Sequence, residues 1–132
     1  MRIPHVEDLF AYECAVNFRE EVHRLVLETP DAYRDFKFRG QLWDAADDVA
    51  SDIAEGFDRH NPGENVNFLR YALASLAEAR TRLAGGITRG FFKEADCKLA
   101  FTWADRCKDV TVKLLESQKR ERDRRKRKGK RP

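Results

Sequence analysis

Residues 41–57 have the sequence QLWDAADDVASDIAEGF, which sorts apolar and acidic side chains onto two faces of a helix. The apolar side chains recur at three- and four-residue intervals, the spacing that aligns them along one face. They are Leu42, Ala45, Ala46, Val49, Ile53 and Phe57. The other face carries no Lys or Arg and five carboxylates: Asp44, Asp47, Asp48, Asp52 and Glu55. We predict a helix over about residues 38–56 that buries its apolar face. We expect it to end at Gly56, since glycine enters the left-handed conformation of a helix end without a Cβ clash.

Three further segments show the same helical period. Two are residues 6–28 and 64–88, and the third begins near Phe92 or Lys93 and keeps its apolar period to Leu114; we expect this last helix to continue past Ser117 to Gly129. The apolar positions of the third are Phe92, Ala95, Leu99, Trp103, Cys107, Val110 and Leu114. Residues 32–40 hold aromatic side chains without a helical period, so we expect a connector there, and residues 58–63 contain turn signals. No window alternates as a strand does. We therefore predict an all-α fold, an antiparallel up-down-up-down four-helix bundle.

The charge of the chain is concentrated at its end. Residues 119–132, KRERDRRKRKGKRP, contain ten of the 26 Lys and Arg residues but only two of the 23 acids. A tail of net charge +8 thus follows a body of net charge −5. The length of 132 residues fits one domain, which we place at residues 1–118, with residues 119–132 as a basic tail. Acid–base pairs at four-residue spacing within the tail favour a continuation of the last helix.

A basic tail predicts binding to a polyanion. Lys and Arg side chains that neutralise backbone phosphates release counterions, and the Arg guanidinium suits phosphate oxygens. The nucleic-acid-binding candidates are Lys119, Arg120, Arg122, Arg124, Arg125, Lys126, Arg127, Lys128, Lys130 and Arg131. Additional basic residues that can extend this surface are Arg70, Arg80, Arg82 and Arg89. No aromatic side chain is interleaved in the tail, so we expect little base stacking and weak sequence specificity. The alternatives are a solvated terminus, or a tail that docks on an acidic protein.

The sequence lacks the pattern of a di-metal helical bundle. Such a site needs two Glu-x-x-His motifs, and the chain offers one, at Glu20 and His23. Neither His5 nor His60 follows a Glu at that spacing. We therefore expect no metal site, and we expect His23 at the surface or at an interface.

Catalytic patterns are also missing. Three cysteines in no CxxC spacing argue against a zinc site and against a disulfide framework: Cys14, Cys97 and Cys107. Gly85-Gly86 lacks the Lys and Ser/Thr of a phosphate-binding loop. We expect a protein that is not an enzyme and that uses no cofactor. The acidic residues near the N-terminus and the absence of a long apolar run predict a cytoplasmic location.

About residues 5–115 resemble a small four-helix-bundle family encoded in intervening sequences of bacterial 23S ribosomal RNA genes. The residues that match the family motif are Ile53, Ala54, Glu55, Gly56, Phe57, Arg59, Ser75, Leu76 and Glu78. Phe68-Leu69 and Ala72 match as well. The sequence departs from the usual serine, proline, asparagine and glycine of the family at Asp48, Ala50, Asp52 and Ala74.

This resemblance implies an up-down bundle that assembles as a homopentamer and binds ribosomal RNA or a ribonucleoprotein, without catalysis. Related bundles are accessory proteins of diversity-generating retroelements that act with a reverse transcriptase, which is the alternative function. The acidic face of residues 41–57 has two interpretations: it pairs with Arg residues of a neighbouring subunit, or it is exposed to water.

Overall fold

In the computed structural model the described residues are 6–59 and 61–129, and all regular structure within them is helical. The elements are α1 (Val6–Leu27), α2 (Pro30–Arg34), α3 (Phe36–Phe57), α4 (Pro62–Thr88), the 3-10 turn η1 (Glu94–Cys97) and α5 (Lys98–Gly129). The all-α prediction is confirmed. The last helix runs to Gly129, as expected from the charge pairs of the tail, and the boundary drawn between residues 118 and 119 lies inside it.

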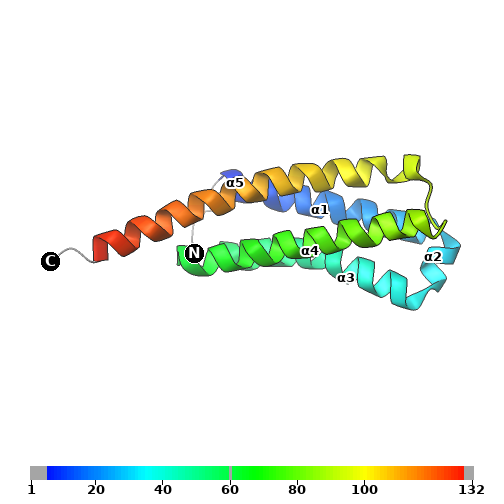
Figure 1. The fold of residues 1–132 in the computed structure, drawn as a ribbon, viewed down its shortest axis with the longest axis horizontal. Coiled ribbons are helices and arrows are strands. Elements are labelled where there is room, and N and C mark those ends of the chain that lie inside the picture. Colours follow the sequence, from blue (N-terminus) through cyan, green and yellow to red (C-terminus); the bar gives the residue numbers. More distant parts are fainter. Residues whose placement is uncertain (1–5, 60, 130–132) are drawn as a thin grey trace.

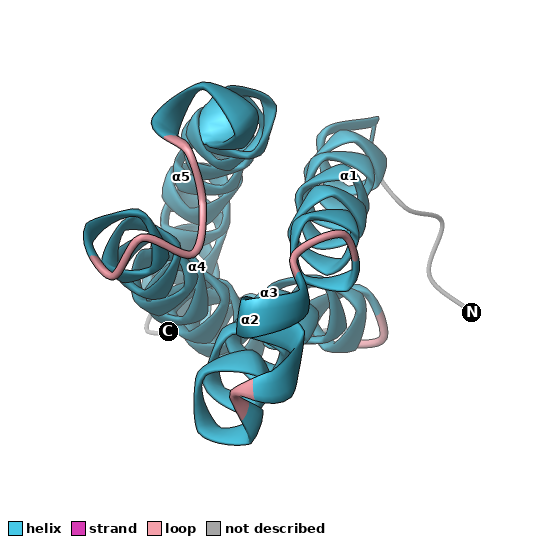
Figure 2. Ribbon diagram, turned by 90° about the vertical axis from the view of Figure 1, so that its right-hand side faces the viewer, coloured by secondary structure: helices cyan, strands magenta, loops and turns pink. Residues whose placement is uncertain are grey.

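Four long helices lie along the length of the molecule, and the chain passes from one end to the other along each of them in turn (Figure 1). α3 packs against α1 and α4, and α5 packs against the same two helices. Seen end-on, the four helices surround a common centre (Figure 2). The short α2 lies at the end where α1 leads into α3, and the last turns of α5 extend past the opposite end (Figure 1).

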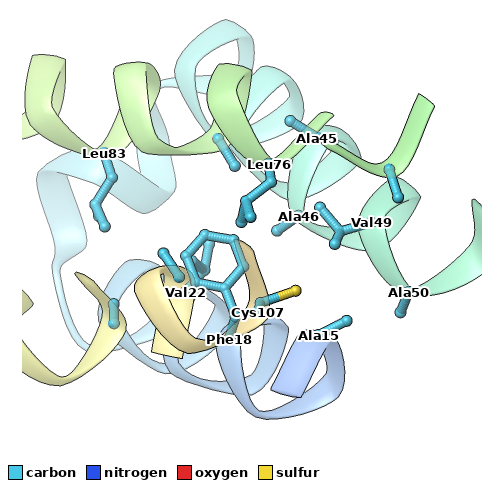
Figure 3. Packing of buried hydrophobic residues seen from close by; sticks show 14 of the residues in the cluster. Ala15, Phe18, Val22, Ala45, Ala46, Val49, Ala50, Leu76, Leu83 and Cys107 are labelled. Atoms are coloured by element: carbon cyan, nitrogen blue, oxygen red, sulfur yellow. The ribbon is translucent and has the colours of Figure 1, made fainter. Parts of the chain in front are cut away.

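The core is built from the apolar faces of all four long helices. Its largest fully buried side chains include Phe18 of α1, Ile53 of α3 and Leu76 of α4. Figure 3 shows the Phe18 ring close to Leu76 and to Cys107 of α5. The predicted face of α3 is confirmed, and its positions that are at most 2% exposed are Leu42, Ala45, Ala46, Val49 and Ile53.

The prediction of a non-helical connector over residues 32–40 is wrong. α2 begins at Pro30, where a missing N–H costs nothing because the first turn of a helix has no partner for it. Asp35 then caps α3, and its carboxylate accepts a hydrogen bond from the backbone N–H of Phe38 at 3.0 Å. Local capping therefore extends helical structure into a stretch that has no apolar period. Asn61 similarly caps α4, which begins two residues before the predicted start.

The last helix begins at Lys98 rather than at Phe92 or Lys93, and its predicted apolar face is confirmed in part: Cys107 and Leu114 are buried, and Trp103 and Val110 pack against the core. The preceding turn is held by Gly86, whose carbonyl accepts hydrogen bonds from the N–H groups of Phe91 and Phe92 at 2.9 and 3.3 Å. Leu99, predicted to be buried, is 51% exposed. The buried positions of α5 are Ala100, Ala104, Cys107, Thr111, Leu114 and Leu115. Small side chains, Ala100 and Ala104, form the first part of this buried face and allow the helices to approach closely, and Leu114 and Leu115 continue it.

Gly56 lies inside α3 and does not end it. The helix continues to Phe57, and among the glycines of the described ranges Gly90 is the one with positive φ, at 81°. The prediction of a left-handed Gly56 is therefore wrong. Glycine is needed at this position because a Cβ would clash with Oδ1 of Asn65, a residue of α4 that is 2% exposed. Gly56 thus permits close packing of α3 on α4.

Candidate nucleic-acid interface

Eight of the ten candidate nucleic-acid-binding residues lie on the last turns of α5, from Lys119 to Lys128. We call these turns the basic segment. The other two candidates, Lys130 and Arg131, lie outside the described residues. Lys119 and Arg122 are partly buried, and the six exposed cations are Arg120, Arg124, Arg125, Lys126, Arg127 and Lys128. Because one continuous helix carries them all, the bundle fixes the direction in which this charge projects.

Ion pairs along the helix stabilise the basic segment, which lacks an apolar face. Glu121 accepts hydrogen bonds from Arg124 at 2.6 Å and from Arg125 at 3.1 Å, and these bonds lower the pKa of Glu121 to about 2. Lys119 lies 3.4 Å from Glu116, one turn earlier. Pairs of this spacing each contribute about 0.2–0.5 kcal/mol to an isolated helix. Glu121 and Glu116 therefore stabilise the helix, while the segment keeps a large excess of positive charge.

The fold brings the basic segment against the start of α4. An open pocket of about 580 Å³ lies between them, and it is lined by Asn61, Pro62, Gly63, Glu64, Asn67, Arg122, Arg125 and Lys126. We call it the α4–α5 pocket. The stem of Arg122 lies over Gly63, since a Cβ at Gly63 would be 3.7 Å from Cδ of Arg122. Sequence reasoning missed the α4 residues of this pocket because they carry no charge pattern and meet α5 only in the folded chain.

The basic residues of α4 do not extend the basic segment as predicted. Arg89 lies at the opposite end of the molecule, where it donates to Asp35 at 2.8 Å and stacks over the Phe91 ring at 4.5 Å. Arg80 pairs with Asp105 of α5, and Arg82 lies 3.6 Å from Glu78. Arg80 and Arg89 therefore join neighbouring elements of the bundle, and Arg82 forms an ion pair within its own helix. Arg70 is exposed and lies nearer the start of α4.

The acidic face of α3 contains carboxylates that repel one another. Burial and the neighbouring Asp44, Asp47 and Glu78 raise the pKa of Asp48, and burial together with Asp48 and Glu55 raises the pKa of Asp52. Asp47 differs from the rest, because its Oδ1 lies 2.9 Å from Nε2 of His23 on α1. The His23 ring also packs against Trp43, with centroids 5.0 Å apart. His23 thus lies in a contact between α1 and α3.

Replacing Asp52 with Asn is expected to stabilise the lone chain slightly at pH 7. A carboxyl whose folded pKa is raised above its unfolded value destabilises the fold while it is ionised, and this effect disappears as the pH falls below the unfolded pKa. Because Asp52 is only partly buried, we expect a gain within about 0.5 kcal/mol. Thermal unfolding between pH 7 and pH 4 measures it, and the gain should shrink towards the acid end. Asp109→Asn, at an exposed position of α5, is the matched control. A loss of stability in Asp52→Asn would instead show that this carboxylate has a cationic partner, such as a second subunit.

The family-motif residues gather where α3 meets α4. Ile53 and Leu76 are in the core, and Glu55 lies 3.4 Å from Arg59, which stacks over the Phe68 ring at 4.9 Å. The remaining motif positions that are buried or partly buried are Ala54, Gly56, Phe57 and Ser75. Glu78 is exposed and pairs with Arg82 on its own helix. The motif therefore lies mainly in the contact between two helices, away from the basic segment.

The thiol groups are not placed for chemistry. Cys14, Cys97 and Cys107 are all buried, and burial raises the pKa of Cys97 to about 11 and that of Cys107 to about 12. Thiols of such high pKa are poor nucleophiles near neutral pH. Within residues 6–59 and 61–129, no three His, Cys, Asp or Glu side chains are grouped so that they could hold a metal ion. In the same ranges, no helix is both long and apolar enough to cross a membrane.

The comparison with protein families yields one match. A family model described as 23S rRNA-intervening sequence protein matches residues 7–113, which span the chain from α1 to the middle of α5. No curated protein matches the chain. The basic segment lies beyond the matched range, and so do the three α5 residues of the α4–α5 pocket, Arg122, Arg125 and Lys126.

Proposed function

We propose, since this chain belongs to the 23S rRNA-intervening sequence protein family, that it is a non-enzymatic RNA-binding protein whose contacts are made by the basic segment. The observation that carries this proposal is the concentration of eight cations, six of them exposed, on the last turns of α5, which extend past the end of the bundle. Ten residues of helix are about 15 Å long. Such a rod can follow several consecutive phosphates without paying the entropy of ordering a flexible tail.

The charge of the rest of the molecule supports the same choice of surface. The body of the chain is acidic, and the carboxylates on α3 already raise one another's pKa values. A polyanion is repelled by that face and attracted by the basic segment. Arg side chains outnumber Lys in the tail, and the guanidinium group binds phosphate oxygens in a bidentate manner. The segment is therefore the surface of this chain best suited to a phosphate backbone.

We assign the four long helices to the antiparallel up-down-up-down class of four-helix bundles, a choice supported by the pairs of helices that pack together. The homopentamer expected from the family resemblance stays a prediction, and light scattering at micromolar concentration measures it. Action with a reverse transcriptase stays the alternative.

Neutralising four exposed cations of the basic segment is expected to weaken RNA binding at least about tenfold at low salt. The variant replaces Arg120, Arg124, Arg127 and Lys128 with Gln. Since each lost phosphate contact removes close to one unit of salt dependence, the slope of log affinity against log salt should fall by about 3–4. Titration of a structured RNA hairpin at several salt concentrations gives both quantities.

The control for this experiment removes the same net charge elsewhere. Lys37, Lys93, Lys98 and Lys108 are exposed outside the basic segment, and their replacement with Gln should leave affinity and slope nearly unchanged. Equal losses in the two variants would indicate that only net charge matters. If the unmodified protein fails to bind RNA even at low salt, the proposed function is wrong, and an acidic protein becomes the partner to test.

A further inference from the structure

Tyr71 is an exposed aromatic side chain in the first half of α4. It is 57% exposed, and its ring packs edge-on against Phe68, with centroids 5.9 Å apart and planes at 85°. Phe68 is in turn covered by the guanidinium of Arg59 at 4.9 Å from the ring centroid. The contact with Phe68 supports the Tyr71 ring from one side, while more than half of the side chain remains accessible to a ligand.

The position of Tyr71 on α4 places it beside the α4–α5 pocket. Tyr71 follows Asn67 by four residues, so the two side chains share a helix face, and Asn67 lines the pocket. One helical turn separates them, a rise of about 5.4 Å along the axis. Glu64 is the acidic residue that lines the pocket, and its carboxylate oxygen Oε2 lies 3.9 Å from Nη1 of Arg59. The cations of α5 that line the pocket and the exposed ring of Tyr71 therefore lie at the same end of α4.

We infer that Tyr71 and the α4–α5 pocket together bind an unpaired RNA nucleotide. The base stacks on the Tyr71 ring, and the adjoining phosphate is held by Arg122, Arg125 and Lys126. This inference rests on the proposed function and adds the class of RNA to it. A base within a continuous duplex has both faces covered by its neighbours, so only a single-stranded or looped nucleotide can use the ring. An exposed aromatic next to a cationic groove is the arrangement with which proteins bind single strands.

The test compares two aromatic positions and two RNA forms. Tyr71→Leu removes the aromatic ring and keeps an apolar side chain, whereas Tyr71→Phe keeps the ring. Tyr33→Leu is the matched control, because Tyr33 is 43% exposed but lies on α2 at the opposite end of the molecule. The probes are a 12-nucleotide oligoadenylate and a 12-base-pair RNA duplex, titrated at one low salt concentration. Thermal unfolding of each variant confirms that it is folded.

We expect Tyr71→Leu to weaken binding of oligoadenylate about tenfold and to leave binding of the duplex unchanged. Tyr71→Phe and Tyr33→Leu should bind both probes as the unmodified protein does. An unchanged affinity of Tyr71→Leu for oligoadenylate, or equal losses for the two probes, would overturn the stacking inference. In either case the proposed function survives as long as the neutralised basic segment loses affinity. Failure of the unmodified protein to bind either probe would overturn both.

Discussion

Replacing Ile53 with Asp is expected to leave much of the chain unfolded at room temperature. Ile53 is 1% exposed at the centre of the apolar face of α3. The substitution removes a large apolar side chain and buries a carboxylate in the apolar core, and such changes cost at least about 4 kcal/mol. The total stability of a domain of this size is about 5–15 kcal/mol, so the expected loss is a large fraction of it.

Far-UV circular dichroism with urea unfolding measures this effect. Ser51→Asp is the control, because it adds the same charge to the same helix at an exposed position and should unfold near the midpoint of the unmodified protein. Ile53→Val should lose only about 1 kcal/mol, since it removes one buried methylene. A cooperative transition of Ile53→Asp at an unchanged midpoint would show that this position is not in the core.

Alanine substitutions at the adjacent residues Gly85 and Gly86 are expected to have opposite effects on stability. Both residues lie within α4, where Ala is favoured over Gly by up to about 1 kcal/mol. A Cβ at Gly85 meets nothing within 4 Å, so we expect Gly85→Ala to stabilise the protein by about 0.5 kcal/mol. A Cβ at Gly86 would lie 2.7 Å from two atoms of the Phe92 ring and 2.9 Å from the Phe38 ring.

The two rings at Gly86 have little room to move. Phe38 and Phe92 are each 6% exposed, and their centroids are 5.9 Å apart. Overpacking of this kind typically costs about 1–3 kcal/mol, so Gly86→Ala should be destabilising by about 1 kcal/mol or more despite the gain in helix propensity. Thermal and urea unfolding of the two variants, compared with the unmodified protein, measure the sign of each stability change. If both variants gain stability, Gly86 is not the close contact between α4 and the turn that precedes α5.

The helical regions were predictable where one side of a segment is apolar and the other charged. The apolar period of residues 41–57 correctly predicts the buried side of α3, since Leu42, Val49 and Ile53 are all buried. The same method placed Leu99 in the core, and that prediction was wrong. A period of three and four residues is satisfied by more than one stripe on a helix rich in small and large apolar side chains. Which stripe is buried depends on how closely the neighbouring helices approach.

The glycines show a second limit of reasoning from sequence. Gly56 is predicted to end a helix, because glycine is common there, whereas Gly86 lies inside the predicted segment 64–88 without a reason in its own pattern. Both lie within helices, at points where a side chain of another segment fills the space of a Cβ. That neighbour is Asn65 for Gly56 and Phe92 for Gly86. A local pattern cannot distinguish a glycine required by conformation from one required by packing, because the neighbour is supplied by another segment.

The sequence by itself determined the helical class, the helical continuation of the tail and the concentration of cations between residues 119 and 132. These properties follow from side-chain period and charge along a single segment, which act locally. Only the tertiary structure decided that Arg122 and Arg125 face the start of α4 and that Arg89 pairs with Asp35 at the far end. Each of these contacts involves residues that are far apart in the sequence. Helix packing brings them together, because burial of the apolar faces sets how α4 and α5 lie against each other.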